Sequence, residues 1–263
     1  MVKKVLITGI TGTLGSALGE LYLKRGWDVH GVTRQSIARH PACSHVITND
    51  QSSIDDALIL LKIEPDLVYL NAGAIEKEIG VMGEPLSEMT QAITTINYTF
   101  PAVFALEAAK LAQKPMDIIA VGSIADGSPS AFGPVYHASK AALHYFIQGT
   151  SPILGYSNPN IKLRLYRPGA IHGPLSWAPV NRLNEKGHKV RAKRCNNAPP
   201  ADKVALHIEK FQNSSKWITN YDEPISFKLL KFFFALAPDH YCRMQHWVWR
   251  RASKFKRPSG RGH

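Results

Sequence analysis

The chain has 263 residues, enough to bury the core of one large domain, and 44% of them are apolar, an ordinary share for a globular protein. No apolar run reaches the roughly 18 to 20 residues that a bilayer-spanning helix requires, and Cys43, Cys195 and Cys242 are too scattered for a disulfide framework or a metal site. The net charge of +12 is concentrated in two segments, because 182–194 holds six Lys or Arg against one acid and 225–263 holds nine against one. We therefore expect a cytoplasmic protein with a neutral body and basic appendages.

The first residues, MVKKVLITGI, place lysines before an apolar run, as a secretory signal peptide does. Glycines follow at once and no small-residue cleavage site completes that pattern, so we expect a buried first strand instead. From there to Pro168, short aliphatic runs alternate with amphipathic stretches, the pattern of repeated βα units on a parallel sheet. Strands are predicted at 4–9, 28–34, 45–50, 67–73, 117–123 and 161–169, and helices near 15–25, 53–63, 85–113 and 134–150. The predicted fold class is therefore α/β, a doubly wound Rossmann-type parallel sheet in one domain.

After Pro168 the regular alternation weakens. Residues 173–200 combine glycine, proline and cations, and they predict a long, mobile, basic loop before a helix over 201–211. We therefore place the domain at 1–211 and treat 212–263 as a basic, amphipathic C-terminal appendage.

The sequence TGITGTLG (8–15) directly follows the first strand and opens the first helix. Gly9, Gly12 and Gly15 let the backbone turn sharply and approach a pyrophosphate, whose charge then meets the free amides at the start of the helix. This context predicts a dinucleotide-binding loop. A plain glycine turn between strand and helix is the alternative.

The end of the second predicted strand indicates which dinucleotide the site prefers. Sites that prefer NAD(H) place an acid there for the ribose 2′-hydroxyl, whereas an arginine suits the 2′-phosphate of NADP(H). The sequence GVTRQS offers Arg34 and no acid. This favours NADP(H) over NAD(H), and an arginine that only caps a surface turn is the alternative.

Tyr136 and Lys140, in the sequence YHASK, lie one helical turn apart and share one face of the helix predicted over 134–150. A free tyrosine has a pKa of about 10, and a nearby cation stabilises its phenolate. The pair therefore predicts a phenol that exchanges protons in a cleft. Taken singly, Tyr136 is better explained as a half-buried interface tyrosine and Lys140 as a solvated helix charge.

Taken in chain order, these motifs resemble those of the classical short-chain dehydrogenase/reductases over about residues 3–210. The interval between Ser123 and Tyr136 is the one typical of the classical branch. The resemblance implies a cofactor site in which Asp50 contacts the adenine and RPG (167–169) lies beside the nicotinamide. The residues that it assigns to this site are Gly9, Thr11, Gly12, Thr13, Leu14, Gly15, Arg34, Asp50, Asn71, Ala72, Gly73, Tyr136, Lys140, Pro168, Gly169 and Ile171.

The same resemblance implies a catalytic set of Asn97, Ser123, Tyr136 and Lys140. Tyr136 would donate a proton to a carbonyl oxygen while the cofactor delivers hydride to carbon, and Lys140 would bond the nicotinamide ribose. Ser123 would hydrogen-bond the developing alkoxide, and Asn97 would anchor a water that relays protons to Lys140. From the residues alone, Ser123 also fits a strand-end cap and Asn97 a buried bond to backbone.

Two positions depart from the family pattern. Thr13 stands where classical members usually have a glycine, so the loop reads as it does in the extended, epimerase-like branch. Gly173 stands where a threonine commonly helps to hold the nicotinamide carboxamide.

The basic segments indicate the partners. Residues 174–200 occupy the place of the family's substrate lid, where Trp177 and Leu183 would cover an apolar group; the cations that would attract an anionic one are Arg182, Lys186, Lys189, Arg191, Lys193 and Arg194. In 225–263, aromatic and aliphatic residues recur at helical intervals beside clustered cations, which is typical of a helix lying on an anionic membrane. Packing of 225–263 on its own domain or on a sister subunit is the alternative, and no reading motif supports nucleic acid.

The sequence thus predicts an NADP(H)-dependent oxidoreductase that interconverts a ketone and a secondary alcohol on a lipid-linked, phosphorylated or otherwise amphiphilic substrate. A nicotinamide-dependent epimerase or dehydratase of a nucleotide- or lipid-linked sugar is one alternative, and a non-catalytic NADP-sensing membrane scaffold is another. The resemblance also implies a homodimer or homotetramer, with the helices near 85–113 and 134–150 forming the dimer face. No metal is expected, and the location expected is cytoplasmic, peripheral on the inner face of the membrane.

Overall fold

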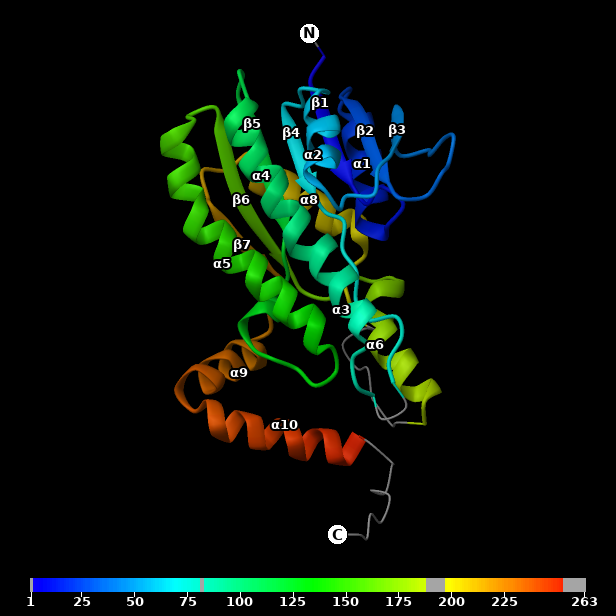
Figure 1. The fold of residues 1–263 in the computed structure, drawn as a ribbon, viewed down its shortest axis with the longest axis vertical. Helices are drawn as coiled ribbons and strands as arrows, with labels where there is room; N and C mark the ends of the chain where they lie inside the picture. The colour runs from blue at the N-terminus through cyan, green and yellow to red at the C-terminus, as the bar shows by residue number, and fades with distance from the viewer. Residues whose placement is uncertain (1, 81–82, 188–196, 253–263) are drawn as a thin grey trace.

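The computed structural model describes residues 2–80, 83–187 and 197–252, and at its centre is a seven-stranded sheet (Figure 1). The strand order is β3-β2-β1-β4-β5-β6-β7, and every pair is parallel. The strands are β1 (Lys4–Thr8), β2 (Asp28–Thr33), β3 (His45–Thr48), β4 (Leu67–Leu70), β5 (Met116–Val121), β6 (Ile161–Pro168) and β7 (Ile218–Tyr221). The doubly wound α/β class predicted from the sequence is confirmed.

Helices cover both faces of this sheet. On one face, α1 (Thr13–Lys24) and α8 (Ala201–Gln212) pack together over a core that includes Val5 and Ile7 of β1. On the other face, α2 (Ile54–Leu61), α4 (Phe100–Leu111) and α5 (Pro134–Ser157) pack over a core that includes Leu6. Because β1 and β4 are buried on both faces, their sequences read as nearly continuous apolar runs.

Smaller elements connect or cap this framework. α3 (Ser87–Thr94) continues through one π-helical turn, η1 (Thr95–Thr99), into α4, and a short 3₁₀ turn, η2 (Ile124–Gly127), follows β5. α6 (Pro174–Glu185), α9 (Ile225–Leu236) and α10 (Pro238–Ala252) lie together at one end of the sheet (Figure 1). No helix among the described residues is long and apolar enough to cross a bilayer.

The strand order places a crevice at that same end. β1 pairs with both β2 and β4, so the chain winds in one direction from β1 to β3 and in the other from β4 to β7. In open parallel sheets such a reversal leaves a crevice outside the carboxyl ends of the strands, where ligands bind. The described part of the chain therefore has one end that is suited to a site.

Three elements differ from the sequence predictions. Residues 174–185 form the helix α6 instead of a loop, because Pro174 occupies its first turn and Arg182 and Leu183 bury against the body. α5 continues past Pro152 to Ser157, since Leu154 packs into the core and Ser151 bonds the carbonyl of Leu163. β7 was not predicted, because it is a short edge strand with no buried residue.

Candidate active site

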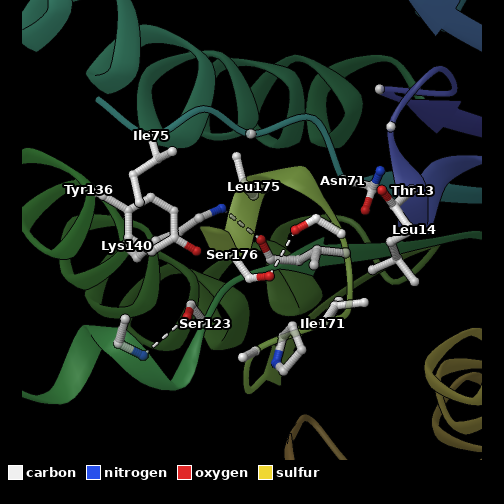
Figure 2. Close-up of a pocket in the computed structure, with 18 of the residues that line it drawn as sticks. Thr13, Leu14, Asn71, Ile75, Ser123, Tyr136, Lys140, Ile171, Leu175 and Ser176 are labelled. Atoms are coloured by element: carbon white, nitrogen blue, oxygen red, sulfur yellow. Dashed lines mark hydrogen bonds between the residues drawn. The ribbon is translucent and has the colours of Figure 1, made fainter. Parts of the chain in front are cut away.

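A cavity of about 1020 Å³ opens at the carboxyl ends of the strands. Two groups of predicted residues lie on opposite sides of it. Figure 2 shows Thr13, Leu14 and Asn71 on one side, Tyr136, Lys140 and Ser123 on the other, and Leu175 and Ser176 of α6 between them. The cavity therefore joins the glycine loop to the Tyr-Lys pair.

The glycine loop is shaped by close backbone contacts. Gly9 has φ +71°, and a Cβ atom on it would lie 2.9 Å from Cα of Ala72. A Cβ on Gly15 would lie 2.1 Å from the carbonyl oxygen of Gly9, so only glycine lets α1 begin this close to β1. The loop is tied to the end of β4 by the Thr8 hydroxyl, which accepts the backbone N–H groups of Asn71 and Ala72 at 2.9 Å each.

Most of the predicted cofactor residues line the cavity. They are Gly9, Thr11, Gly12, Thr13, Leu14, Arg34, Asn71, Ala72, Gly73, Tyr136, Lys140, Pro168, Gly169 and Ile171. Gly15 lies behind the loop rather than in the lining. Asp50, which was expected at the adenine, is exposed and outside the lining. Its neighbour Gln51 lines the cavity instead, buried and held at φ 57°, with its backbone N–H on Asn49 Oδ1 at 3.0 Å.

Arg34 lies where the cavity passes the end of β2. Thr33, the last residue of the strand, is buried and accepts the backbone N–H of Gln35 at 3.1 Å, which turns the chain sharply. Arg34 and Gln35 both line the cavity, and the Arg34 side chain is exposed to solvent. An arginine in this place can meet an anionic group at the far end of a bound dinucleotide.

Tyr136 and Lys140 project into the cavity from the first turns of α5 (Figure 2). Lys140 Nζ donates to the carbonyl of Val121 at 3.0 Å and lies 5.9 Å from the centre of the Tyr136 ring. Ser123 caps η2 by accepting the backbone N–H of Ala125 at 3.1 Å, and it also hydrogen-bonds Tyr136. A phenol, a hydroxyl and an ammonium group therefore converge in one part of the cavity.

The pKa shifts of Tyr136 and Lys140 differ from those predicted from their spacing on the helix. Burial raises the pKa of Tyr136, the bond with Ser123 lowers it by less, and the charges of Asp126 and Glu76 raise it further. Burial also lowers the pKa of Lys140 from 10.5 to about 8, against an opposing effect of Asp126. Lys140 is not among the groups that shift the pKa of Tyr136, so the expectation that it lowers this pKa is not met. The phenol is accordingly protonated at neutral pH.

Asn97 lies in the π-helical turn and is fully buried. Its Oδ1 accepts the backbone N–H of Ala74 at 2.8 Å, and its Nδ2 donates to the carbonyl of Ala74 at 2.8 Å and to Ser139 Oγ at 2.9 Å. The side chain therefore ties the segment after β4 to α5, one residue before Lys140. It is not part of the cavity lining, and its role as a water anchor stays a prediction.

Sequence reasoning missed Glu76, whose carboxylate lies beneath the start of α5. Glu76 is 1% exposed, and its Oε1 accepts the backbone N–H groups of Val135 at 2.9 Å and Tyr136 at 3.4 Å. A carboxylate at this place satisfies free amides and favours the helix dipole. The sequence gives no signal for it, because a single glutamate in a loop reads as a surface residue.

Arg182 corrects a second expectation. It was expected to attract an anionic substrate from a lid, but it is buried, with Nη2 3.7 Å from Glu76 Oε2 and donating to the carbonyl of Phe132 at 2.9 Å. It also donates to the carbonyl of Glu76. Leu183, expected to cover a substrate, is likewise buried against the body. Of the other lid cations, Lys186 is exposed, while Lys189, Arg191, Lys193 and Arg194 lie outside the described residues.

Asp126 is a second buried acid near the pair. Its carboxylate accepts from Arg167 Nε at 2.7 Å, lies 3.0 Å from His144 Nδ1 and lies 3.8 Å from Lys231 Nζ of α9. Its charge partly offsets the effect of burial on Lys140. Lys231 also pairs with Glu223 at 2.6 Å, so α9 is attached to the same charged cluster.

A possible metal-ligand group lies at the opposite end of the sheet. His30 Nε2 and His45 Nε2 lie 3.0 and 3.1 Å from the two oxygens of Asp28. The imidazole rings are stacked, with centres 4.7 Å apart and planes 25° apart, and both contact the same carboxylate. The geometry fits two imidazoles sharing a carboxylate better than it fits a bound ion.

Comparison with protein families agrees with the family resemblance predicted from the sequence. The model of the short chain dehydrogenase family matches residues 61–212, and the model of the NAD dependent epimerase/dehydratase family matches residues 5–99. The uncharacterized oxidoreductase YmfI of Bacillus subtilis is 26% identical over 187 residues, which cover 65% of this chain and 76% of that protein. GDP-mannose 4,6-dehydratase of Yersinia enterocolitica is 36% identical over 88 residues, and the chain spans only 23% of its length.

Solved structures show the same fold. A short chain dehydrogenase from Burkholderia cenocepacia, in complex with NADP, has a TM-score of 0.65 and 16% identity, with 93% of this chain and 97% of that chain covered. The 3-oxoacyl-[acyl-carrier protein] reductase from Brucella melitensis, in complex with NAD, has a TM-score of 0.65 and 20% identity, with coverages of 84% and 95%. At these identities the likeness concerns the fold alone.

Proposed function

Because the chain belongs to the short-chain dehydrogenase family, we propose that it is an NAD(P)-dependent oxidoreductase that interconverts a ketone and a secondary alcohol. One observation carries this proposal: a single cavity runs from the glycine loop to a phenol, a serine hydroxyl and an ammonium group. Those are the groups that bind a dinucleotide and exchange a proton with a substrate oxygen.

The glycine loop fits a dinucleotide. The close contacts of Gly9 and Gly15 leave no room for side chains, so backbone amides at the start of α1 face the cavity, where a pyrophosphate would be held. Arg34 would hold a 2′-phosphate, which supports NADP(H) over NAD(H). Lys140 would hold the nicotinamide ribose. When bound, the cofactor supplies the hydride that is transferred to or from the substrate carbon.

Tyr136 would then serve as the general acid. Its raised pKa keeps the phenol protonated at neutral pH, so it is ready to donate to an oxygen that gains charge as the carbonyl is reduced. Ser123 would share that oxygen through its hydroxyl and stabilise the developing charge. The same groups would take the proton back when the alcohol is oxidised, so both directions of the reaction use this arrangement.

The lining favours an amphiphilic substrate. Ile75, Phe132, Leu175 and Phe227 line the cavity, and Ile75 and Leu175 lie near Tyr136 in Figure 2. Apolar walls around a few polar groups are typical of sites that orient a largely apolar ligand by one reactive group. The apolar part of a keto-lipid, a lipid-linked keto-sugar or a steroid would pack against these walls without giving up hydrogen bonds to water.

A transient use of the nicotinamide, as in an epimerase or dehydratase, is the second candidate. The match of residues 5–99 to the epimerase/dehydratase family favours it, together with the spacing of Gly9, Gly12 and Gly15. Such an enzyme regenerates its cofactor in each cycle, and so it would retain the cofactor through purification.

An assembly of two or four copies is also part of the proposal. α5 presents Tyr145, Ile153 and Tyr156 to solvent at helical spacing, with Tyr156 93% exposed. Exposed apolar residues on one helix face mark a site of association. We place the subunit contact there, on the helices α4 and α5.

The deciding experiment is NADPH oxidation by the purified chain against a panel of keto-sugars, keto-lipids and steroids, with and without detergent. The proposal expects turnover of at least one ketone, faster with NADPH than with NADH. Retained cofactor without net oxidation would favour the epimerase or dehydratase. Binding of NADPH with no turnover and no retained cofactor would favour a sensing scaffold and overturn the enzyme assignment.

A further inference from the structure

α9 presents a continuous apolar face to solvent. Ile225, Leu229, Phe232, Phe233 and Leu236 are between 36% and 74% exposed. Their spacing of four, three, one and three residues places all five within about a third of the helix circumference. We call this face the α9 stripe.

The opposite face of α9 is the one that holds the helix in place. Phe227 lines the cavity, Lys231 pairs with Glu223 and approaches Asp126, and Phe234 packs edge-on against Tyr241 with ring centres 5.1 Å apart. These contacts account for the position of the helix. Within the α9 stripe, Phe233 also packs against Tyr241, with ring centres 6.0 Å apart. The other four residues are at least 62% exposed, and their apolar character requires another partner.

α10 likewise has one face that contacts the body of the protein and one exposed face, and the exposed face is basic. Its inner face holds the body through Tyr241, which donates to the carbonyl of Pro129 at 2.7 Å, and through Gln245, which accepts from Ala131 N–H at 3.2 Å. Arg243, Trp247, Arg250 and Arg251 are exposed and share the outer face at helical spacing. The Arg251 guanidinium lies 3.9 Å from the Trp247 ring, and Trp247 is 53% exposed.

We propose that the α9 stripe and the outer face of α10 dock the protein on an anionic lipid bilayer. Aliphatic and phenyl groups enter the acyl boundary, tryptophan suits the interface, and arginines bind the anionic head groups. Charge selects this partner over a second copy of the chain. The exposed cations of the two described helices are Lys228, Arg243, Arg250 and Arg251, and the one exposed acid is Asp239, which pairs with Arg243 at 2.8 Å. Two copies facing each other would therefore repel, whereas anionic lipid is complementary.

The docking surface also has a direct relation to the cavity, and this part of the inference rests on the proposed function. Pro224 and Phe227 line the cavity, while the residues of the α9 stripe lie on the other side of the same helix. α10 in turn holds the segment around Pro129 and Ala131, next to Phe132 in the lining. A bilayer in contact with the α9 stripe would be separated from this part of the cavity by a single helix, which would shorten the path of an amphiphilic substrate to Tyr136.

Flotation of the full chain with vesicles tests the docking surface without substrate or cofactor. Vesicles of phosphatidylcholine alone are compared with vesicles that also contain phosphatidylglycerol. We expect flotation with the anionic vesicles, weakening with salt, and a loss of about tenfold or more in Arg250→Glu/Arg251→Glu and in Leu229→Ser/Phe232→Ser. Lys24→Glu on α1 and Ile59→Ser on α2 change similarly exposed residues elsewhere and should float as the unchanged chain does.

Two results would overturn the inference. One is failure of the full chain to float with anionic vesicles. The other is flotation of folded Leu229→Ser/Phe232→Ser to the same extent as the unchanged chain, with folding checked by thermal unfolding. Sedimentation without vesicles tests whether a second copy of the chain is the partner instead. If Leu229→Ser/Phe232→Ser dissociates an oligomer and the unchanged chain does not bind vesicles, the α9 stripe is a subunit contact. Because flotation needs no turnover, it can succeed where the oxidoreductase assay fails, and the reverse.

Discussion

Thr13 and Gly173 pack directly against each other: a Cβ atom on Gly173 would lie 2.8 Å from Thr13 Oγ1. These are the two positions at which the chain departs from the family pattern, and the structure brings them into contact inside the cavity lining. A side chain at position 173 would therefore compete with the Thr13 hydroxyl for the same space.

This close contact predicts a strong coupling between the two positions. Gly173→Thr alone should weaken NADPH binding by about tenfold, because the new side chain meets Thr13. Thr13→Gly with Gly173→Thr should recover part of that affinity, because it removes the clash but leaves a β-branched residue at φ +159°. Fluorescence titration of NADPH with the two single variants and the double variant measures the coupling, and additive losses would show that the two residues act separately.

The cofactor preference depends on Arg34. Arg34→Asp should weaken NADPH binding by about tenfold to a hundredfold, since a charge-assisted bond to the 2′-phosphate is lost and replaced by repulsion. NADH binding should improve or stay unchanged. Arg39→Asp, which changes an exposed arginine outside the lining, is the matched control. An unaltered ratio of NADPH to NADH affinity in Arg34→Asp would remove Arg34 from the cofactor site.

We expect the Glu76 carboxylate to position Tyr136 and to compensate the positive charge of Arg182. Glu76→Gln leaves the buried Arg182 without its counter-charge, so the free energy of unfolding should fall by about 3 kcal/mol. The reductase rate should fall as well, because the start of α5 loses a charged acceptor. Denaturant unfolding of Glu76→Gln and of Glu76→Gln/Arg182→Met provides the check. Recovery of stability in the double variant is expected, and equal losses in both would show that the ion pair is not the cause.

The buried Lys140 predicts a pH dependence of both stability and rate. Its pKa is about 8 in the folded chain and near 10.5 when unfolded, so between these values the unfolded chain holds more protons. The unfolding free energy should therefore rise with pH in this window, by up to about 1.4 kcal/mol per pH unit, relative to Lys140→Met. The rate should fall above pH of about 8 as the ammonium is lost. Parallel stability curves for the two chains between pH 8 and 10 would contradict the shift.

The sheet and the helices packed on it were predictable from the sequence because their signals are local. The apolar runs of β1 and β4 and the amphipathic α1 and α5 each carry their own pattern. α6 was missed because its start at Gly173 and Pro174 reads as a break, and its stability comes from the distant partners of Arg182 and Leu183. β7 was missed because its pairing with β6, not its composition, makes it a strand.

The candidate site likewise contains residues that the sequence predicted and residues that it did not. The glycine loop, Ser123, Tyr136 and Lys140 were found because motif spacing marks them, and the fold brings them to one cavity. Glu76, Asp126 and Gln51 were missed because a lone polar residue in a loop shows no sign of burial until tertiary structure places it. Burial is the main cause of the raised pKa of Tyr136, and the charges that add to it belong to two of these missed residues, Asp126 and Glu76. The sequence therefore predicted which polar groups meet in the cavity, whereas the raised pKa of the phenol depends on burial that only the fold reveals.

The most direct test of the proposed chemistry is the rate of NADPH oxidation by Tyr136→Phe, measured beside its affinity for NADPH. Removal of the phenolic hydroxyl should lower kcat by about a hundredfold to ten-thousandfold and leave the Kd for NADPH within about twofold. Tyr145→Phe, an exposed tyrosine on the same helix, should match the unchanged chain. Turnover by Tyr136→Phe within tenfold of the unchanged chain would contradict the assignment of Tyr136 as the proton donor.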